Sequence, residues 1–165
     1  MSSIETRSAN PPNPLDVVQA LATRNGWPFE DTGGDEIVLL VKGRCADYQI
    51  FFTWMRSLEL FHLACAFDLK ATERRRSELQ QLVALINEQL WLGHFDLWSP
   101  DGTVVFRQAL LLAGQSCASP SQCEVMLGTA LDLCERYYPA FQFVLANQSA
   151  EEAIAAVSLE TAGEA

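Results

Sequence analysis

The segment Leu85–Leu112, LINEQLWLGHFDLWSPDGTVVFRQALLL, decides the fold that the sequence predicts. Its first residues continue an apolar repeat that is typical of an amphipathic helix. Gly93 is a natural end for that helix, because glycine tolerates the left-handed backbone conformation. Ser99-Pro100-Asp101-Gly102 predicts a turn between two strands, His94–Trp98 and Thr103–Leu112. A helix followed by such a hairpin indicates a small α+β domain.

The residues before this segment predict one helix and three strands. Asn13-Pro14 offers an N-cap followed by proline in the first turn, and Asn25-Gly26 closes a first helix over residues 14–25. Alternating apolar residues then predict an antiparallel meander with one covered face. Its three strands are Glu36–Val41, Asp47–Trp54 and Glu59–Leu69.

One helix is expected before the hairpin in the sequence and another after it. Thr72 is the expected cap of a second helix, which runs to Leu92. Ser119-Pro120 starts a third helix, and Pro139 should end or bend it. The predicted order is therefore α-βββ-α-ββ-α, with a five-stranded antiparallel sheet packed against helices.

The chain is expected to form one domain with loose ends. Residues 1–13 are polar and rich in proline, which predicts a flexible N-terminal tail. Residues 14–147 form the single domain. Ser149 and Glu152 resemble a capping box for a short helix over Ala150–Val157, so residues 148–165 are expected to hold that helix and a flexible tail.

Composition narrows the class of protein. The net charge of −10 argues against a nucleic-acid partner, which needs a clustered basic face. No apolar run is long enough to span a membrane, and the N-terminus lacks the layout of a secretory signal. The five cysteines are an odd number without CxxC spacing, which is typical of reduced thiols. A cytoplasmic protein is therefore expected.

No catalytic or metal-binding pattern stands out. His62 and Cys65 lie three residues apart on a predicted strand and point to opposite faces, and His94 begins a different strand. Cys65 and Cys134 fall on apolar faces, as core thiols do. We therefore expect no cofactor, no metal and no enzymatic activity.

Four groups of residues carry a resemblance to a known family: Gly26-Trp27, Asn87 to Leu90 with Gly93-His94-Phe95-Asp96-Leu97, Asp101-Gly102 with Val105-Phe106-Arg107, and Tyr137-Tyr138-Pro139. Over about residues 15–145 the chain resembles the YbjN-like bacterial sensory transduction regulators, which share the fold of type III secretion chaperones. The resemblance implies a compact, often dimeric domain that binds proteins or peptides. These motifs are structural rather than catalytic.

Three features are candidates for partner binding. Arg74, Arg75 and Arg76 form either a solvated helix turn or a dock for an acidic group. Trp98 shares a strand face with polar residues, so it is either an exposed aromatic or part of a curved core. Leu111 lies on the second apolar face of its strand, which either a helix or a second copy of the chain would cover.

Two functions follow from these observations. The first is a non-enzymatic regulator or chaperone-like domain that binds a protein or peptide, as a homodimer. The second is a small-molecule sensor with a pocket between helix and sheet, lined by aromatic residues such as Phe52, Trp54 and Phe61.

Overall fold

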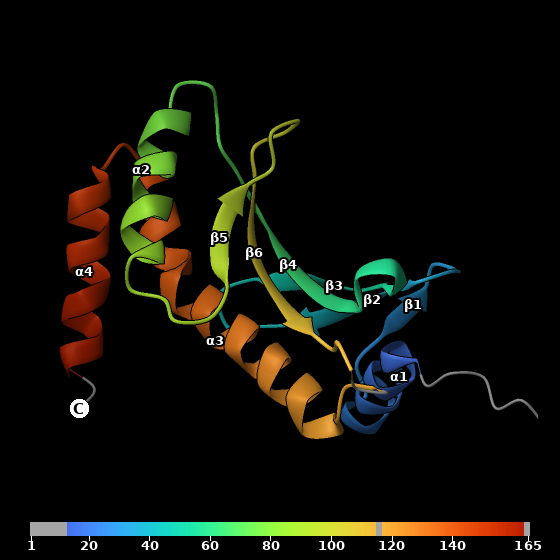
Figure 1. Cartoon of the computed structure of the whole chain (residues 1–165). Coiled ribbons are helices and arrows are strands. Elements are labelled where there is room, and N and C mark those ends of the chain that lie inside the picture. The colour runs from blue at the N-terminus through green and yellow to red at the C-terminus, as the bar shows by residue number, and fades with distance from the viewer. Residues whose placement is uncertain (1–12, 115–116, 164–165) are drawn as a thin grey trace, which may run out of the picture.

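The computed structural model describes residues 13–114 and 117–163, so all of the predicted tail over residues 1–13 except Asn13 lies outside the described residues. These residues form an antiparallel sheet with its helices on one side (Figure 1). The elements in chain order are α1 (Pro14–Asn25), β1 (Phe29–Asp31), β2 (Glu36–Lys42), β3 (Asp47–Met55), the 3-10 helix η1 (Arg56–Leu58), β4 (Leu60–Lys70), α2 (Arg76–Asn87), β5 (His94–Leu97), β6 (Thr103–Leu111), α3 (Pro120–Leu145) and α4 (Ala150–Gly163).

The α+β class is confirmed, and the sheet has six strands in the order β1-β2-β3-β4-β6-β5. The sequence predicted five, because β1 has only three residues and no alternation to reveal it. Phe29 of β1 pairs with Leu39 of β2, which makes β1 an edge strand. The order also inserts β6 between β4 and β5, so residues of β4 and β5 flank the same strand.

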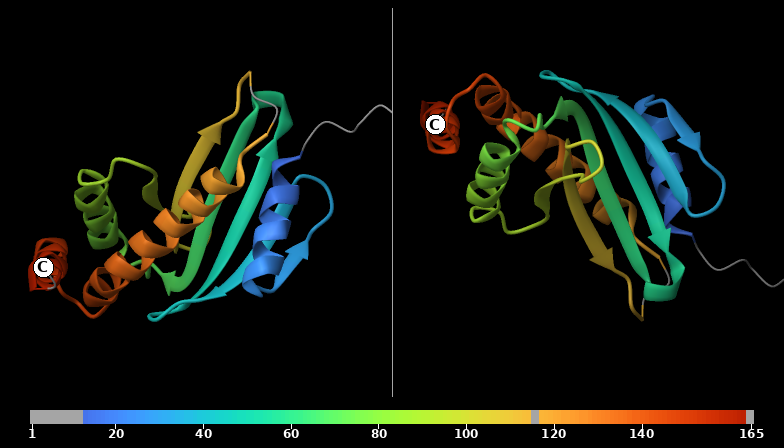
Figure 2. Two further views of the ribbon diagram at one scale, coloured as in Figure 1. Left: turned by 90° about the horizontal axis from the view of Figure 1, so that it is seen from below. Right: turned by 90° about the horizontal axis from the view of Figure 1, so that it is seen from above.

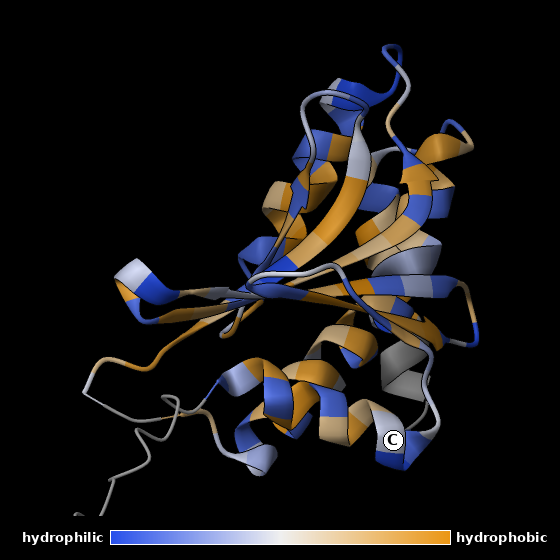
Figure 3. Ribbon diagram, turned by 90° about the vertical axis from the view of Figure 1, so that its right-hand side faces the viewer, coloured by the Kyte–Doolittle hydropathy of each residue, from blue (hydrophilic) through white to orange (hydrophobic). Residues whose placement is uncertain are grey.

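The core lies between the sheet and the helices. Figure 2 shows α1 and α3 lying across one face of the sheet, with the opposite face uncovered. The alternate strand residues that point toward the helices include the largest fully buried side chains, among them Tyr48, Ile50, Phe52, Phe61, Leu63, Phe95 and Phe106. In Figure 3 the central strands are largely hydrophobic, and the loops at their ends are hydrophilic.

The predicted ends of α1 and the start of α3 are confirmed. The side chain of Asn13 accepts a 3.1 Å hydrogen bond from the Leu15 N–H, and Gly26 takes a left-handed φ of 67°. Ser119 and Gln122 form a reciprocal capping box at the start of α3. Local sequence therefore determines these helix ends.

The predicted bounds of α2 are wrong at both ends. Thr72 is not its cap, because residues 72–75 form a turn and the helix starts at Arg76. The helix ends at Asn87 rather than Leu92, because the carboxamide of Asn87 bonds both backbone groups of Phe95, at 2.8 and 3.0 Å. Asn87 thus attaches the end of α2 to the edge strand β5.

Pro139 does not end α3, which continues to Leu145. Proline has no N–H to donate to the carbonyl four residues earlier, which here belongs to Glu135. The thiol of Cys45, in the β2–β3 turn, lies 3.8 Å from that carbonyl oxygen and donates to it. This contact from the β2–β3 turn therefore helps α3 to continue beyond Pro139.

The capping box before α4 is confirmed, with Ser149 and Glu152 bonding each other's backbone N–H groups at 3.1 and 3.0 Å. The helix runs to Gly163, six residues beyond the predicted Val157. Ala150, Ala153 and Val157 are buried, so α4 packs against the core of the domain.

Candidate functional site

The uncovered face of the sheet carries a groove of about 870 Å³. The strand residues on this face alternate with those that point into the core. They supply apolar floor residues such as Leu40 of β2, Phe51 of β3 and Ala66 of β4. No helix lies on this face within the described part of the chain (Figure 2). The groove is therefore an apolar surface open to solvent.

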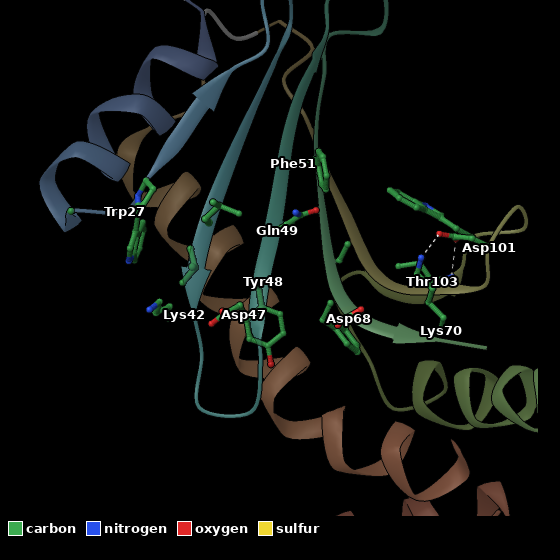
Figure 4. A pocket seen from close by; sticks show the side chains of 17 residues that line it. Trp27, Lys42, Asp47, Tyr48, Gln49, Phe51, Asp68, Lys70, Asp101 and Thr103 are labelled. Carbon is green, nitrogen blue, oxygen red and sulfur yellow. Dashed lines mark hydrogen bonds and ion pairs between the residues drawn. The ribbon is translucent and has the colours of Figure 1, made fainter. Parts of the chain in front are cut away.

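Two walls border the groove. Figure 4 shows Trp27, just after α1, on one side and Lys70, Asp101 and Thr103 on the other, with Phe51 between them. Trp98, at the end of the β5–β6 hairpin, also lines it. The groove thus depends on the hairpin turn being held in place.

Hydrogen bonds and one ion pair hold that turn. The Asp101 carboxylate accepts a 3.1 Å bond from the Thr103 N–H and lies 3.1 Å from Lys70 Nζ. Hydrogen bonds from Thr103 and the charge of Lys70 lower the pKa of Asp101 to about 2. Gly102 Cα faces Ala71, whose N–H donates to the Gly102 carbonyl at 2.8 Å. The hairpin turn is therefore anchored to the end of β4.

Trp98 is exposed over 39% of its surface. Its ring centroid lies 6.4 Å from that of Phe51, with the two planes tilted by 54°. Of the two sequence alternatives for Trp98, the structure thus favours an aromatic on the open face over one in the core. An aromatic pair that is half open to solvent is typical of binding surfaces.

Leu111 lies at the other end of β6 and is 64% exposed. Thr103, beside Trp98, lies eight steps earlier on the strand, which corresponds to roughly 26 Å. The structure therefore does not bring Leu111 and Trp98 into one site. The second apolar face of β6 is covered at Val105 and open at Ala109 and Leu111.

The edge of β6 is unpaired near Leu111. Backbone groups alternate sides along a strand, and the hairpin bond from Trp98 N to Thr103 O shows that odd-numbered residues of β6 point toward β5. Pairing with β5 stops at Arg107. Among the described residues, nothing bonds the outward backbone groups of Ala109 and Leu111.

The three arginines of the cluster Arg74–Arg76 differ in their contacts. Arg75 reaches the end of α3, where its Nε donates to the Val144 carbonyl at 2.8 Å and its guanidinium NH₂ to Gln148 O at 2.5 Å. Within residues 13–114 and 117–163, Arg74 and Arg76 make no such contact. Arg75 thus stabilises the fold, which leaves Arg74 and Arg76 as the candidates for binding.

Trp91, one of four tryptophans that the sequence leaves open between core and interface, is 99% exposed in the loop before β5. Phe52 and Phe61, expected to line a pocket between helix and sheet, are fully buried core residues that stack with centroids 5.3 Å apart. The groove lies on the opposite face of the sheet. A sequence does not reveal which face the helices leave open, so no local signal located it.

Among the described residues, no cluster of three or more His, Cys, Asp or Glu side chains could hold a metal ion. None of the described helices combines the length and apolarity needed to cross a membrane.

Comparison with models of known protein families shows which family the chain belongs to. Residues 14–143 match the family model YbjN, described as "Putative bacterial sensory transduction regulator". The chain belongs to the YbjN family. Its resemblance to that family, inferred from the motifs around Gly93 and Asp101-Gly102, is therefore confirmed. No curated protein matches the chain.

A solved structure has the same fold. It is the crystal structure of YbjN from E. coli, titled "a putative transcription regulator", with a TM-score of 0.52 and 14% sequence identity. The match covers 95% of this chain and 96% of that one. At this identity the likeness concerns the fold alone.

Proposed function

We propose that this YbjN-family domain is a non-enzymatic regulator that binds a protein segment in the groove on its open sheet face. The observation that carries the proposal is an apolar groove of about 870 Å³, with Trp27 and Trp98 at its walls and no helix over it. Aromatic side chains are enriched where proteins bind partners.

The chemistry of the groove defines the partner. Its floor is apolar, and its rim carries both signs of charge, with Lys42 near Asp47 and Lys70 paired with Asp101. A segment with apolar side chains and little net charge fits this surface best. A nucleic acid does not, because the chain carries a net charge of −10.

A peptide selected from a random-sequence phage library on the full chain supplies the probe. Backbone and indole NMR signals of the ¹⁵N-labelled protein are then followed during titration with that peptide. The proposal expects shifts centred on Phe51 and Trp98. Shifts confined to the outer surface of α3 or α4 would contradict it.

We also propose that the chain forms a homodimer through the unpaired edge of β6. Gln108–Leu112 carries no charged residue, so two copies could approach there despite the net charge of each chain. Antiparallel pairing of two such edges about a two-fold axis would satisfy the outward backbone groups of Ala109 and Leu111.

A small-molecule sensor is the second candidate. The groove volume falls within the range of about 300–1,000 Å³ that is typical of ligand pockets. A thermal-shift screen against metabolites distinguishes the two functions, because a bound ligand raises Tm in proportion to the logarithm of its concentration over Kd. A peptide binder would show no such hit.

We place the protein in the cytoplasm. All five cysteines are free thiols, which persist in a reducing compartment.

A further inference from the structure

Both histidines of the chain lie beside one arginine on the open face of the sheet. His94 of β5 is the cross-strand partner of Arg107 on β6. His62 of β4 flanks β6 from the other side, two residues from the partner of Arg107. The strand order β4-β6-β5 therefore brings together three nitrogen-bearing side chains that are distant in sequence.

These side chains line a hollow of about 360 Å³, separate from the apolar groove. Its lining is completed by Gly93, Gln108 and Ala109. Gly93 lies so close to Arg107 O and to the Phe106 ring that a Cβ would overlap both. The absence of a side chain at this position keeps the strands close together and the hollow open.

The contacts within the hollow leave hydrogen-bond donors free. Arg107 Nε donates to His62 Nε2 at 3.3 Å, so this nitrogen of His62 carries a lone pair. Arg107 Nη1 lies 3.7 Å from Asp96 Oδ2, beyond hydrogen-bond distance. A guanidinium has five N–H donors, so most of those on Arg107 have no acceptor among the described side chains.

The electrostatics of the hollow favour an anion. The charged and titratable groups around His62 are Arg107 of β6, His94 and Asp96 of β5, and Glu36 of β2. Glu36 approaches through Thr53, the cross-strand partner of His62, whose hydroxyl donates to Glu36 Oε2 at 3.2 Å. Burial, then Arg107, then His94 lower the pKa of His62 below its ordinary value of 6.5. Of the two acids, Asp96 forms an exposed pair with Arg107 that contributes little, and the Glu36 carboxylate is bonded to Thr53.

We propose that His62, His94 and Arg107 form a binding site for an oxyanion, a carboxylate or a phosphate group. The Arg107 guanidinium binds two oxygens of the anion through parallel N–H donors. The imidazole of His94 borders the same hollow and supplies a further donor. Protonation of His62 releases its bond from Arg107 and adds a positive charge, so the site binds more tightly as the pH falls.

Histidine NMR tests this proposal directly. The chain has two histidines, and a His94→Gln variant assigns their imidazole signals. The pH titration of His62 is recorded in inorganic phosphate, in acetate and in chloride at equal ionic strength. A bound anion stabilises the protonated form, so the pKa of His62 should rise by about half a unit or more relative to chloride.

The two anions distinguish the sources of the ligand. A rise in phosphate alone identifies a phosphate site, a rise in acetate alone a carboxylate site, and a rise in both an oxyanion site without further selectivity. Equal pKa values in all three solutions would overturn the proposal. Arg107→Gln should abolish the rise, whereas Arg56→Gln, which alters an arginine paired with Asp35, should preserve it.

A loss of the effect in Arg56→Gln as well would show that the rise does not depend on Arg107 in particular and would also overturn the proposal. The wild-type titration does not depend on the stability of any variant. The titration also needs no protein partner. A negative result at the histidine site would therefore leave the proposed groove function unaffected, and a failure of peptide binding in the groove would leave the anion site unaffected.

Discussion

The hydroxyl of Tyr48 donates a 2.6 Å hydrogen bond to Oε1 of Glu135 and thereby ties β3 to α3. The same carboxylate accepts bonds from the backbone N–H groups of Arg44 and Cys45, at 3.0 and 3.1 Å. Burial and this bond raise the pKa of Tyr48 well above its ordinary range. Glu135 thus joins the β2–β3 turn, near one end of the groove, to the covering helix.

Glu135→Gln should lower the free energy of unfolding by about 1–3 kcal/mol at pH 7, because charged hydrogen bonds are lost in a mostly buried place. Burial alone would raise the pKa of Glu135, but bonds from Tyr48, Cys45 and Arg44 outweigh it and hold the pKa below the ordinary 4.5. The wild-type advantage is therefore present above pH 4.5 and disappears as pH falls through the lower pKa of the folded state.

Urea unfolding at several pH values measures this difference. Glu124→Gln is the matched control, because Glu124 also lies on α3 but its pair with Arg24 is exposed. The control should change stability by less than about 0.5 kcal/mol. Equal losses for both variants would contradict the role assigned to Glu135.

Gly43 and Gly128 should respond in opposite directions to alanine. A Cβ at Gly43 would overlap Glu135 Oε1 and the Tyr48 ring, so Gly43→Ala should destabilise by about 1–3 kcal/mol. A Cβ at Gly128 meets no atom within 4 Å, and this glycine lies inside α3. Gly128→Ala should therefore stabilise by about 0.5–1 kcal/mol. Thermal unfolding of both variants checks the signs.

Adjacent arginines should differ in their effect on folding. Arg75→Gln removes two bonds to carbonyls at the end of α3 and should cost about 1–3 kcal/mol. Arg74→Gln should cost almost nothing, because this exposed side chain has no such contact among the described residues. Chemical denaturation distinguishes them, and comparable losses would show that Arg75 does not anchor α2 to α3.

Leu111→Lys should convert a dimer into a monomer. The substitution places a charge at the unpaired edge of β6, where two copies would meet. Leu159→Lys is the control, since Leu159 is 75% exposed on α4, away from this edge. Size-exclusion chromatography with light scattering gives the masses. A wild-type monomer, or a dimer that persists in Leu111→Lys, would contradict the proposed interface.

Local sequence rules predicted much of the fold. The Asn13 cap, the turn before Gly102, the helix start at Ser119-Pro120 and the capping box at Ser149 each depend on residues close in the chain, and each is confirmed. Tertiary contacts decided the rest. The bond of Arg75 to Val144 shows that α2 starts where it docks on α3, which no local pattern reveals.

The candidate sites were harder to predict because they depend on strand order. His62 lies within β4, and His94 is the first residue of β5. Only the insertion of β6 between these strands brings both histidines beside Arg107. The sequence left Trp98 open between an exposed aromatic and a core residue, and its pairing with Phe51 depends on the curvature of the sheet. Hydrophobic periodicity predicts which residues share a face of a strand, but it does not predict which strands lie beside it.

The most direct test of the central claim compares two exposed tryptophans. Trp98 lines the groove, whereas Trp91 is 99% exposed and lies outside it. The measurement is Kd of the selected peptide, by fluorescence anisotropy, for wild type, Trp98→Ala and Trp91→Ala. Binding in the groove predicts that Trp98→Ala weakens affinity at least about tenfold while Trp91→Ala leaves it unchanged. Wild-type affinity in Trp98→Ala, or an equal loss in both variants, would contradict it.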